Sequence, residues 1–316
     1  MKKLASTKGI SKEEWIRLRM QGIGGSEAAT AVGISRYHSR INLYLQKIGD
    51  LPIPQIDNER LYWGTVLEDV IAKEFSKRTG YGIQKLNYII QHDDFPFMIG
   101  DIDRLILDDQ GPIGILECKN TSAYMEKEWT EDNFPIDYIV QIQHYLAITG
   151  YQFGYFAVLL GGNKFISKRI DRDEEFINML ISKEKEFWHF VETKTIPPLD
   201  GTPDSTELVK SLYPHVTKDA IMLDSSENDK IKRLLDLKQQ QKDIEYNIAE
   251  IENQLKAQIA DHAYGFTNQY TVSWNEYENN IFDVNKFKSE HLDLYKNYVI
   301  SKKVRKFSVT QNKEVK

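Results

Sequence analysis

The sequence has a single cysteine and no long apolar run, and both features rule out particular classes of protein. Cys118 is the single cysteine among 316 residues, which excludes a disulfide framework, a four-cysteine zinc site and a cysteine-ligated iron–sulfur cluster. No stretch approaches the roughly 20 apolar residues that a membrane helix needs. The first residues, MKKLASTKGISKEEW, lack the apolar run of a secretory signal. We therefore expect a soluble cytoplasmic protein with no membrane partner.

Net positive charge is also absent. The net charge is −6, which argues against a protein that passively coats nucleic acid. The segment 301–316, SKKVRKFSVTQNKEVK, differs, because it holds six Lys or Arg residues against one glutamate. A local basic segment or a bound metal ion can still attract phosphate to an acidic protein. The alternative is a solvated, inert tail.

The proline-rich segment 195–206, TIPPLDGTPDST, is the best candidate for a domain boundary. It predicts one domain of residues 1–205 and a C-terminal extension of residues 206–316. In the extension, apolar residues and glutamines recur at alternating spacings of three and four, which predicts a long helix or a helical hairpin. These positions are Leu234, Leu237, Gln241, Ile244, Ile248, Ile251, Leu255 and Gln258. Such a seam suits an intramolecular hairpin, an oligomer contact or a docking site for a partner.

Helical and strand-like segments alternate in the first domain, which predicts an α/β fold. A helix near residues 11–21 is followed by Gly24 and Gly25, and Ser26 is then a plausible N-cap of a second helix. Further helices are expected at 60–79, 134–150 and 174–193, and strands at 86–91, 97–107, 114–119, 151–162 and 164–170.

The segment GPIGILECKN, residues 111–120, carries a glutamate and a lysine in an otherwise apolar strand. Strand side chains alternate between faces, so Glu117 and Lys119 share one face while Cys118 points to the core behind. Alone, this pair is typical of an exposed ion pair on a strand. Whether this pair has a functional role depends on which residue of the adjacent strand lies opposite Glu117.

Asp103 is predicted to lie opposite Glu117. The turn DDQG at residues 108–111, centred on Gln110, makes the two strands an antiparallel hairpin, and directly opposed Cβ atoms are about 4.5–5.5 Å apart. Two carboxylates at that separation repel each other. A divalent cation such as Mg²⁺ or Mn²⁺ between them removes the repulsion.

Glu68 interrupts an apolar helix face that it shares with Ile71 and Phe75. A carboxylate in such a place costs free energy unless something pairs with it, and a metal ion beside the sheet is one such partner. The alternative is a boundary residue at the rim of the helix. Lys119 is then placed to polarise an attacking water and to stabilise charge on a phosphorane-like transition state.

The order helix-Glu, strand-Asp, strand-Glu-x-Lys, helix-Gln resembles the PD-(D/E)XK nuclease superfamily, and in detail its lambda-exonuclease/YqaJ phage recombinase branch. The matching segments lie within about residues 15–160 and read RLRMQGIGGSEAATAVG, YWGTVLEDVIAKEF, GDIDRLIL, GILECKNTS and YIVQIQHYLAITGY. The resemblance implies a restriction-endonuclease-like core, with a mixed central sheet flanked by helices, and a mainly helical C-terminal extension.

The resemblance also implies roles for individual residues. Three carboxylates would be metal ligands, with a catalytic lysine and a site glutamine: Glu68, Asp103, Glu117, Lys119 and Gln141. Arg19 and Ser26 would bind a terminal 5′-phosphate, and Leu61 would be an apolar wedge at the terminal base pair. The alternatives are a plain N-cap for Ser26 and core packing for Leu61.

Three positions complicate the match. The usual PDG reads Ile102-Asp103-Arg104 here, so the turn after the aspartate is expected to differ. Asp101 is a rival for Asp103, which we prefer for its symmetry with Glu117. His144 lies one turn from Gln141, where a metal or general-base role competes with a core or rim position.

The resemblance implies a Mg²⁺-dependent 5′→3′ exonuclease acting on double-stranded DNA ends, with Mn²⁺ as a substitute ion. Its 3′ overhangs would pass to a phage-type single-strand annealing protein, and a ring-shaped trimer is plausible. A bacterial host cytoplasm and a phage or prophage origin are expected. The alternatives are an endonuclease of the same fold and a catalytically silent DNA-binding or recombinase-loading module.

Overall fold

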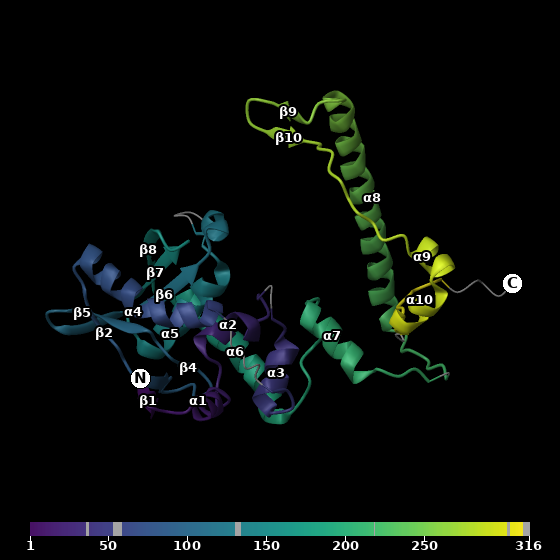
Figure 1. Ribbon diagram of the computed structural model, residues 1–316. Coiled ribbons are helices and arrows are strands. Elements are labelled where there is room, and N and C mark those ends of the chain that lie inside the picture. The colour runs from purple at the N-terminus through teal and green to yellow at the C-terminus, as the bar shows by residue number, and fades with distance from the viewer. Residues whose placement is uncertain (36–37, 53–58, 130–133, 218, 302–303, 312–316) are drawn as a thin grey trace. The chain divides into compact units, whose positions relative to one another are not determined.

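The computed structural model describes residues 1–35, 38–52, 59–129, 134–217, 219–301 and 304–311 (Figure 1). The chain divides into two compact units, Met1–Pro214 and His215–Lys316. Both clusters of buried apolar residues contain only residues of the first unit. The first unit therefore has its own core.

A mixed five-stranded sheet, in the order β2-β5-β6-β7-β8, lies at the centre of the first unit. Its strands are β2 (Gly82–Gln84), β5 (Arg104–Asp108), β6 (Gly111–Thr121), β7 (Phe153–Leu160) and β8 (Lys164–Asp171). Only β6 and β7 pair in parallel. An antiparallel sheet accompanies it, formed by β1 (Lys2–Ser6), β3 (Tyr88–Gln91) and β4 (Ile99–Gly100).

Helices cover both faces of the central sheet (Figure 1). The helices of the first unit are α1 (Lys12–Arg19), α2 (Gly25–Ala31), α3 (Arg40–Ile48), α4 (Glu59–Thr79), α5 (Ile136–Thr149), α6 (Glu174–Thr193) and α7 (Pro203–Leu212), with a 3₁₀ turn η1 (Ala123–Glu128) after β6. The helices predicted at 60–79, 134–150 and 174–193 therefore correspond to α4, α5 and α6.

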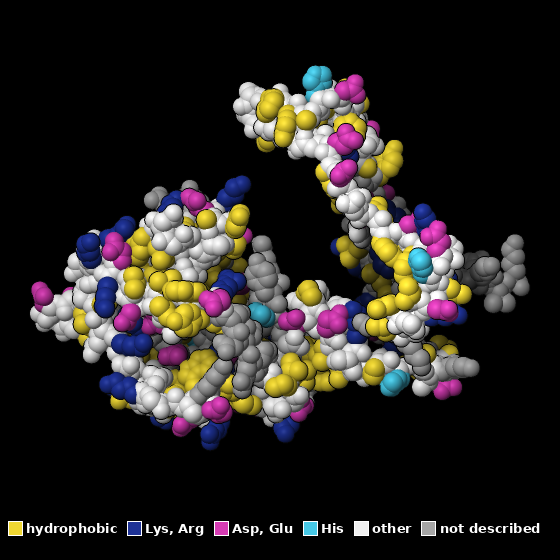
Figure 2. Space-filling view, viewed as in Figure 1, with side chains coloured by type: hydrophobic (Ala, Val, Ile, Leu, Met, Phe, Trp, Pro, Cys, Tyr) yellow, Lys and Arg dark blue, Asp and Glu magenta, His cyan; other side chains and the backbone are white. Residues whose placement is uncertain are grey.

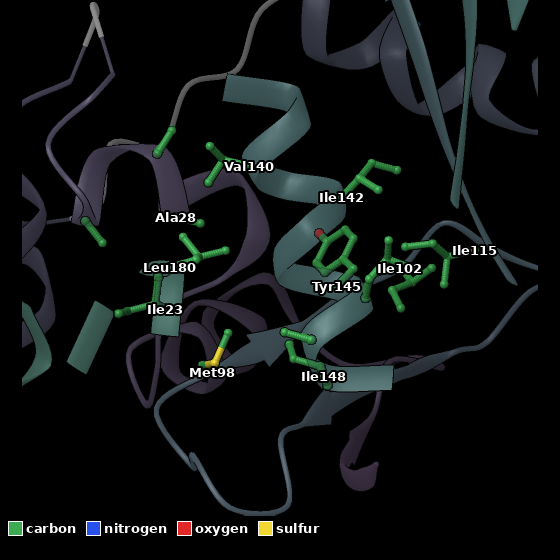
Figure 3. Packing of buried hydrophobic residues seen from close by; sticks show 14 of the residues in the cluster. Ile23, Ala28, Met98, Ile102, Ile115, Val140, Ile142, Tyr145, Ile148 and Leu180 are labelled. Carbon is green, nitrogen blue, oxygen red and sulfur yellow. The ribbon is translucent and has the colours of Figure 1, made fainter. Parts of the chain in front are cut away.

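Alternation along β6 assigns its side chains to the two faces. Leu116 packs in the cluster that contains Phe75 of α4, and Cys118 packs against that cluster. Ile115 packs instead in the cluster that contains Ile142 of α5. Glu117 and Lys119, two and four residues after Ile115, share its side of the sheet. Figure 3 shows this side, with Ile142 and Tyr145 projecting from α5.

A β-bulge sets the register of the β5–β6 hairpin. Next to the turn Leu107 pairs with Pro112, whereas beyond it Ile106 pairs with Gly114, so Ile113 is the extra residue. The shifted register continues to Arg104 and Leu116. Asp103 immediately precedes β5 and, continuing this register, lies opposite Glu117, as predicted from the sequence.

Close approach of two helices requires glycine at the start of α2. A Cβ at Gly25 would lie 2.4 Å from the Tyr145 ring on α5. The N-cap of α2 is Gly24, and Ser26 lies in the first turn. The predicted N-cap role of Ser26 is therefore wrong, because the chain enters the helix two residues earlier.

The predicted boundary after residue 205 falls inside α7, which belongs to the first unit. Asp200 explains this extension, because it accepts hydrogen bonds from the backbone N of Arg40 at 3.3 Å and from Ser205 Oγ at 2.5 Å. These bonds tie the proline-rich segment and the start of α7 to α3. The break comes after Pro214 instead.

The second unit consists of α8 (Glu227–Ile259), β9 (Tyr264–Phe266), β10 (Thr271–Ser273), α9 (Val284–Glu290) and α10 (Leu292–Tyr298). The heptad-like segment is thus one long helix and not a hairpin. Its seam is exposed at Ile244, Ile248 and Ile251, and Figure 2 shows apolar side chains on the surface of this unit. Among the helices that the structure describes, none has the length and apolar character needed to cross a membrane.

Candidate active site

The carboxylates of Asp103 and Glu117 meet at the point where β5 begins. Asp103 Oδ2 accepts a hydrogen bond of 2.8 Å from the backbone N of Cys118. The neighbouring Glu117 is 4% exposed. The hairpin register therefore brings together two carboxylates that the sequence places 14 residues apart.

One oxygen of Glu117 is occupied and the other has no partner. Glu117 Oε1 accepts from Lys119 Nζ at 2.7 Å and from Gln141 Nε2 at 2.6 Å. Glu117 Oε2 is buried and has no hydrogen-bond partner within the described ranges. An unpaired buried carboxylate oxygen is costly, so this atom points to an additional cationic or hydrogen-bonding ligand.

Burial and the charges of neighbouring groups shift the pKa values of Asp103, Glu117 and Lys119. Burial, with the charge of Glu117, raises the pKa of Asp103 well above its usual value. Burial also raises the pKa of Glu117, although Lys119 and Gln141 oppose the shift. For Lys119, burial alone lowers the pKa, but the charges of Glu117 and Asp103 outweigh it and raise the pKa. An additional cation would stabilise both ionised carboxylates, and their oxygen donors fit a hard divalent cation.

Glu68 is paired with two basic side chains. Its Oε1 accepts from Arg104 NH1 at 2.5 Å and lies 3.5 Å from Lys85 Nζ. The second guanidinium nitrogen of Arg104 pairs with Asp69. Burial alone lowers the pKa of Arg104, but Glu68 and Asp69 outweigh it and raise the pKa. In the part of the chain that the structure describes, no three His, Cys, Asp or Glu side chains are grouped to hold a metal ion.

A cavity of about 510 Å³ opens beside these carboxylates. Its lining includes the carboxylates of Glu68, Asp101 and Asp103 together with Trp15 and Lys85. Asp101 Oδ2 accepts a hydrogen bond of 3.3 Å from Trp15 Nε1. Asp101, the alternative to Asp103, therefore lines the same cavity and is hydrogen-bonded to α1. Asp103 is hydrogen-bonded to the backbone of β6 instead.

Arg19 and Ser26 come together as predicted, and two further charged residues join them. Arg19 NH2 donates to Ser26 Oγ at 3.1 Å and pairs with Glu27 Oε1 at 2.8 Å. Lys47 Nζ donates to Glu27 Oε2 at 2.7 Å. Burial alone raises the pKa of Glu27, but Arg19 and Lys47 outweigh it and lower the pKa. Arg19 and Lys47 carry two positive charges and Glu27 carries one negative charge, so the cluster has a net positive charge.

Leu61 is 54% exposed near the start of α4, where the adjoining Tyr62 and Trp63 are also exposed. The core-packing alternative for Leu61 is therefore wrong. The wedge role stays a prediction.

His144 is a core residue and not a free base. Its ring is fully buried, with Nδ1 2.8 Å from Glu184 Oε1 and Nε2 2.9 Å from the carbonyl oxygen of Ile99. Both nitrogens are occupied. Cys118 likewise packs against the apolar cluster on the α4 side, as expected.

Two site residues were missed in the sequence. Tyr145 donates to the carbonyl oxygen of Asp101 at 3.1 Å, and its hydroxyl lies 3.3 Å from Gln141 Nε2. Its spacing of four from Gln141 places both on one helix face and was a usable signal. Arg104 was noted only as a departure from the family motif. No sequence signal connects it to Glu68 and Asp69, because that contact depends on how α4 packs.

The two sequence comparisons with known proteins agree on one family. Residues 14–152 match the family described as the YqaJ-like viral recombinase domain. The Bacillus subtilis (strain 168) protein YqaJ is 37% identical over 312 residues, covering 98% of this chain and 97% of that one.

A solved structure shares the fold. The alkaline exonuclease LHK-Exo from Laribacter hongkongensis superposes with a TM-score of 0.50 at 21% identity, covering 64% of this chain and 99% of that one. The predicted fold class, a mixed central sheet flanked by helices with a mainly helical C-terminal extension, is confirmed.

Proposed function

Since the chain belongs to the YqaJ-like viral recombinase family, we propose that it is a metal-dependent 5′→3′ exonuclease of double-stranded DNA ends. The observation that carries this proposal is the buried Asp103–Glu117 pair, with an unpartnered carboxylate oxygen and an adjacent lysine. Its products would be 3′ single-stranded overhangs for a phage-type annealing protein.

In this proposal the carboxylates, the lysine and the glutamine of the site have separate roles. Asp103 and Glu117 would hold Mg²⁺, or Mn²⁺ in its place, and such an ion supplies an activated water and charge neutralisation on the phosphodiester. Lys119, 2.7 Å from Glu117, stabilises negative charge on the reacting phosphate and orients the nucleophile. Gln141 fixes the Glu117 carboxylate through its hydrogen bond of 2.6 Å.

Arg19 and Ser26 would anchor the terminal 5′-phosphate. The guanidinium and the hydroxyl are already adjacent at 3.1 Å, and the excess positive charge of the Arg19, Glu27 and Lys47 cluster favours an anion. Re-binding of each new 5′-phosphate would favour successive cuts on one strand. Leu61 would part the terminal base pair.

The test uses end-labelled linear duplex, with and without a 5′-phosphate, in Mg²⁺ and in EDTA. We expect release of nucleotides from the 5′ end that needs both the metal and the phosphate. Cutting of covalently closed circles would instead favour an endonuclease, and absence of any cutting in Mg²⁺ or Mn²⁺ would favour a silent DNA-binding module. Light scattering of the same sample tests the ring-shaped trimer that the resemblance implies.

A further inference from the structure

The apolar seam of α8 is uncovered. α8 is one uninterrupted helix of 33 residues (Figure 1), and along this helix, all of which the structure describes, Ile259 is the one buried residue. In the middle of the helix Ile244, Ile248 and Ile251 are 58%, 52% and 59% exposed. A helix in a protein is stabilised mainly by burial of its apolar face, so this face requires a partner.

The spacing of the seam is that of a coiled coil. In a heptad abcdefg the apolar positions a and d face the partner helix. The a positions of α8 are Leu234, Gln241, Ile248 and Leu255, and the d positions are Leu237, Ile244, Ile251 and Gln258. This seam is about 36 Å long at 1.5 Å per residue. A partner that covers it must present an apolar seam of similar length, and α8 of a second copy does so.

Two copies of α8 match along the whole seam when they run in opposite directions. A two-fold axis midway between Ile244 and Ile248 then places Ile244 against Ile248 of the second copy, and Leu237 against Leu255. The remaining layers pair Gln241 with Ile251 and Leu234 with Gln258. Every a and d residue therefore has a counterpart.

Gln241 does not oppose this direction. A parallel pair would place it against Gln241 of the other copy, where the two amides could bond to each other. Its Nε2 instead donates to Glu245 Oε1 of its own helix at 2.8 Å. The amide is therefore already satisfied and needs no second glutamine opposite it.

The charges beside the seam are complementary in the antiparallel direction. The e positions of the two helices then face each other, which brings Lys238 next to Glu252 of the second copy twice by symmetry. Glu252 pairs with Lys256 of its own helix at 3.0 Å but is 58% exposed, so it has room for a second cation. Glu245 meets its own copy once, at the axis. A parallel pair would place Lys238 against Arg233 twice, with no attraction in return.

We propose that α8 is a dimerisation surface, which forms an antiparallel two-stranded coiled coil with α8 of a second copy of this chain. Two-fold symmetry accounts for the opposite charges of Lys238 and Glu252 at the two ends of one row. The inference does not depend on the proposed nuclease chemistry, because all the proposed site residues lie in the first unit.

Thiol cross-linking of the full chain tests the pairing and its direction. Leu237 and Leu255 are about 27 Å apart along one helix at 1.5 Å per residue, so a short bis-maleimide cannot link these two positions within one chain. In the antiparallel pair each lies opposite the other residue of the second copy. A chain with both Leu237→Cys and Leu255→Cys should form covalent dimers on a denaturing gel, whereas each single variant should not.

The matched control is the pair Gln239→Cys and Asn253→Cys, exposed residues at f positions on the outer side of the same helix, which should not be linked. The wild-type chain, whose single Cys118 packs against an apolar cluster of the first unit, gives the background. Covalent dimers from a single variant would show a parallel pair. No dimers from the double variant would show that α8 is not paired with a second copy, and either result would overturn the proposal.

Charge reversal in the double-cysteine chain tests the flanking contacts. Lys238→Glu should raise the protein concentration needed for half-maximal cross-linking by about tenfold, because two attractions become repulsions. Adding Glu252→Lys should restore it, and Lys242→Glu, at an exposed position away from the seam, is the control for net charge. Stronger dimerisation of Lys238→Glu, as a parallel pair requires, or no recovery in the double reversal, would overturn the arrangement.

Discussion

Gln141 of α5 donates a hydrogen bond of 2.6 Å to Glu117 Oε1 of β6, the same oxygen that Lys119 approaches at 2.7 Å. Two donors on one oxygen orient the carboxylate so that its second oxygen is left without a partner. A buried carboxylate with one oxygen saturated and one available is suited to receive a cation. Five predictions follow from this arrangement and from the fold around it.

Lys119→Ala should reduce kcat for linear duplex by at least about 100-fold, as for loss of a donor to developing transition-state charge. Gln141→Ala should cost about 10- to 100-fold, because it loosens a metal ligand. Single-turnover digestion at saturating Mg²⁺ measures both. Lys73→Ala, an exposed lysine on α4, is the control, and full activity of a cleanly purified Lys119→Ala would contradict the site.

Arg19→Ala should remove the preference for 5′-phosphorylated ends, because its guanidinium lies against Ser26 Oγ. We expect KM for phosphorylated duplex to rise by about 10-fold or more, as for loss of a charge-assisted hydrogen bond. The matched control is Arg17→Ala, exposed on the same helix. An unchanged ratio of KM values with and without the phosphate would rule out this anchor.

The His144–Glu184 pair should make stability depend on pH. Burial alone lowers the pKa of His144, but Glu184 and the Ile99 carbonyl outweigh it and raise the pKa. A histidine whose pKa is raised by folding stabilises the protein below about pH 6.5, and this contribution is lost as pH rises through the folded value.

His144→Gln tests this dependence by urea unfolding from pH 6 upward. At the acidic end it should cost about 3–5 kcal/mol, as for a broken buried pair, and the difference from wild type should shrink as pH rises. A difference that stays constant or grows with pH would show that His144 is not charged in the folded protein.

Gly25→Ala should destabilise the first unit, because the added Cβ would lie 2.4 Å from the Tyr145 ring. Overpacking of this kind costs about 1–3 kcal/mol, measured by thermal or urea unfolding. Gly64→Ala in α4 is the matched control, since nothing lies within 4 Å of its added Cβ. That change should stabilise the helix by up to about 1 kcal/mol, and equal effects at the two sites would argue against the close helix contact.

A fragment of residues 1–214 should fold cooperatively and retain Mg²⁺-dependent digestion. Both buried apolar clusters and all the proposed site residues lie within it. Circular dichroism melting and the end-labelled assay check this. A fragment that ends at residue 205 should be less stable, because it truncates α7 (Pro203–Leu212). An unfolded 1–214 fragment would mean that the second unit contributes to the core.

Rules of local sequence were sufficient to predict the arrangement of side chains within the β5–β6 hairpin. The period of two and the DDQG turn place Glu117 and Lys119 on one face and Asp103 opposite Glu117, and the structure agrees, although a bulge at Ile113 was needed to complete the register. The heptad-like spacing predicted either a long helix or a helical hairpin, and the structure has the single helix α8. The structure divides the chain later than predicted, after Pro214, and the sequence does not reveal the hydrogen bond that the backbone N of Arg40 donates to Asp200.

Spacing along the chain was enough to predict the alternation of the strands, the carboxylate pair, the lysine beside it and the family resemblance. Spacing did not predict that Gly24 caps α2, that His144 is buried against Glu184, or that Arg104 pairs with Glu68. Those outcomes depend on which helix packs on which face of the sheet. A buried charged side chain pairs with an oppositely charged group that lies close in space, and separation along the sequence does not reveal which group that is.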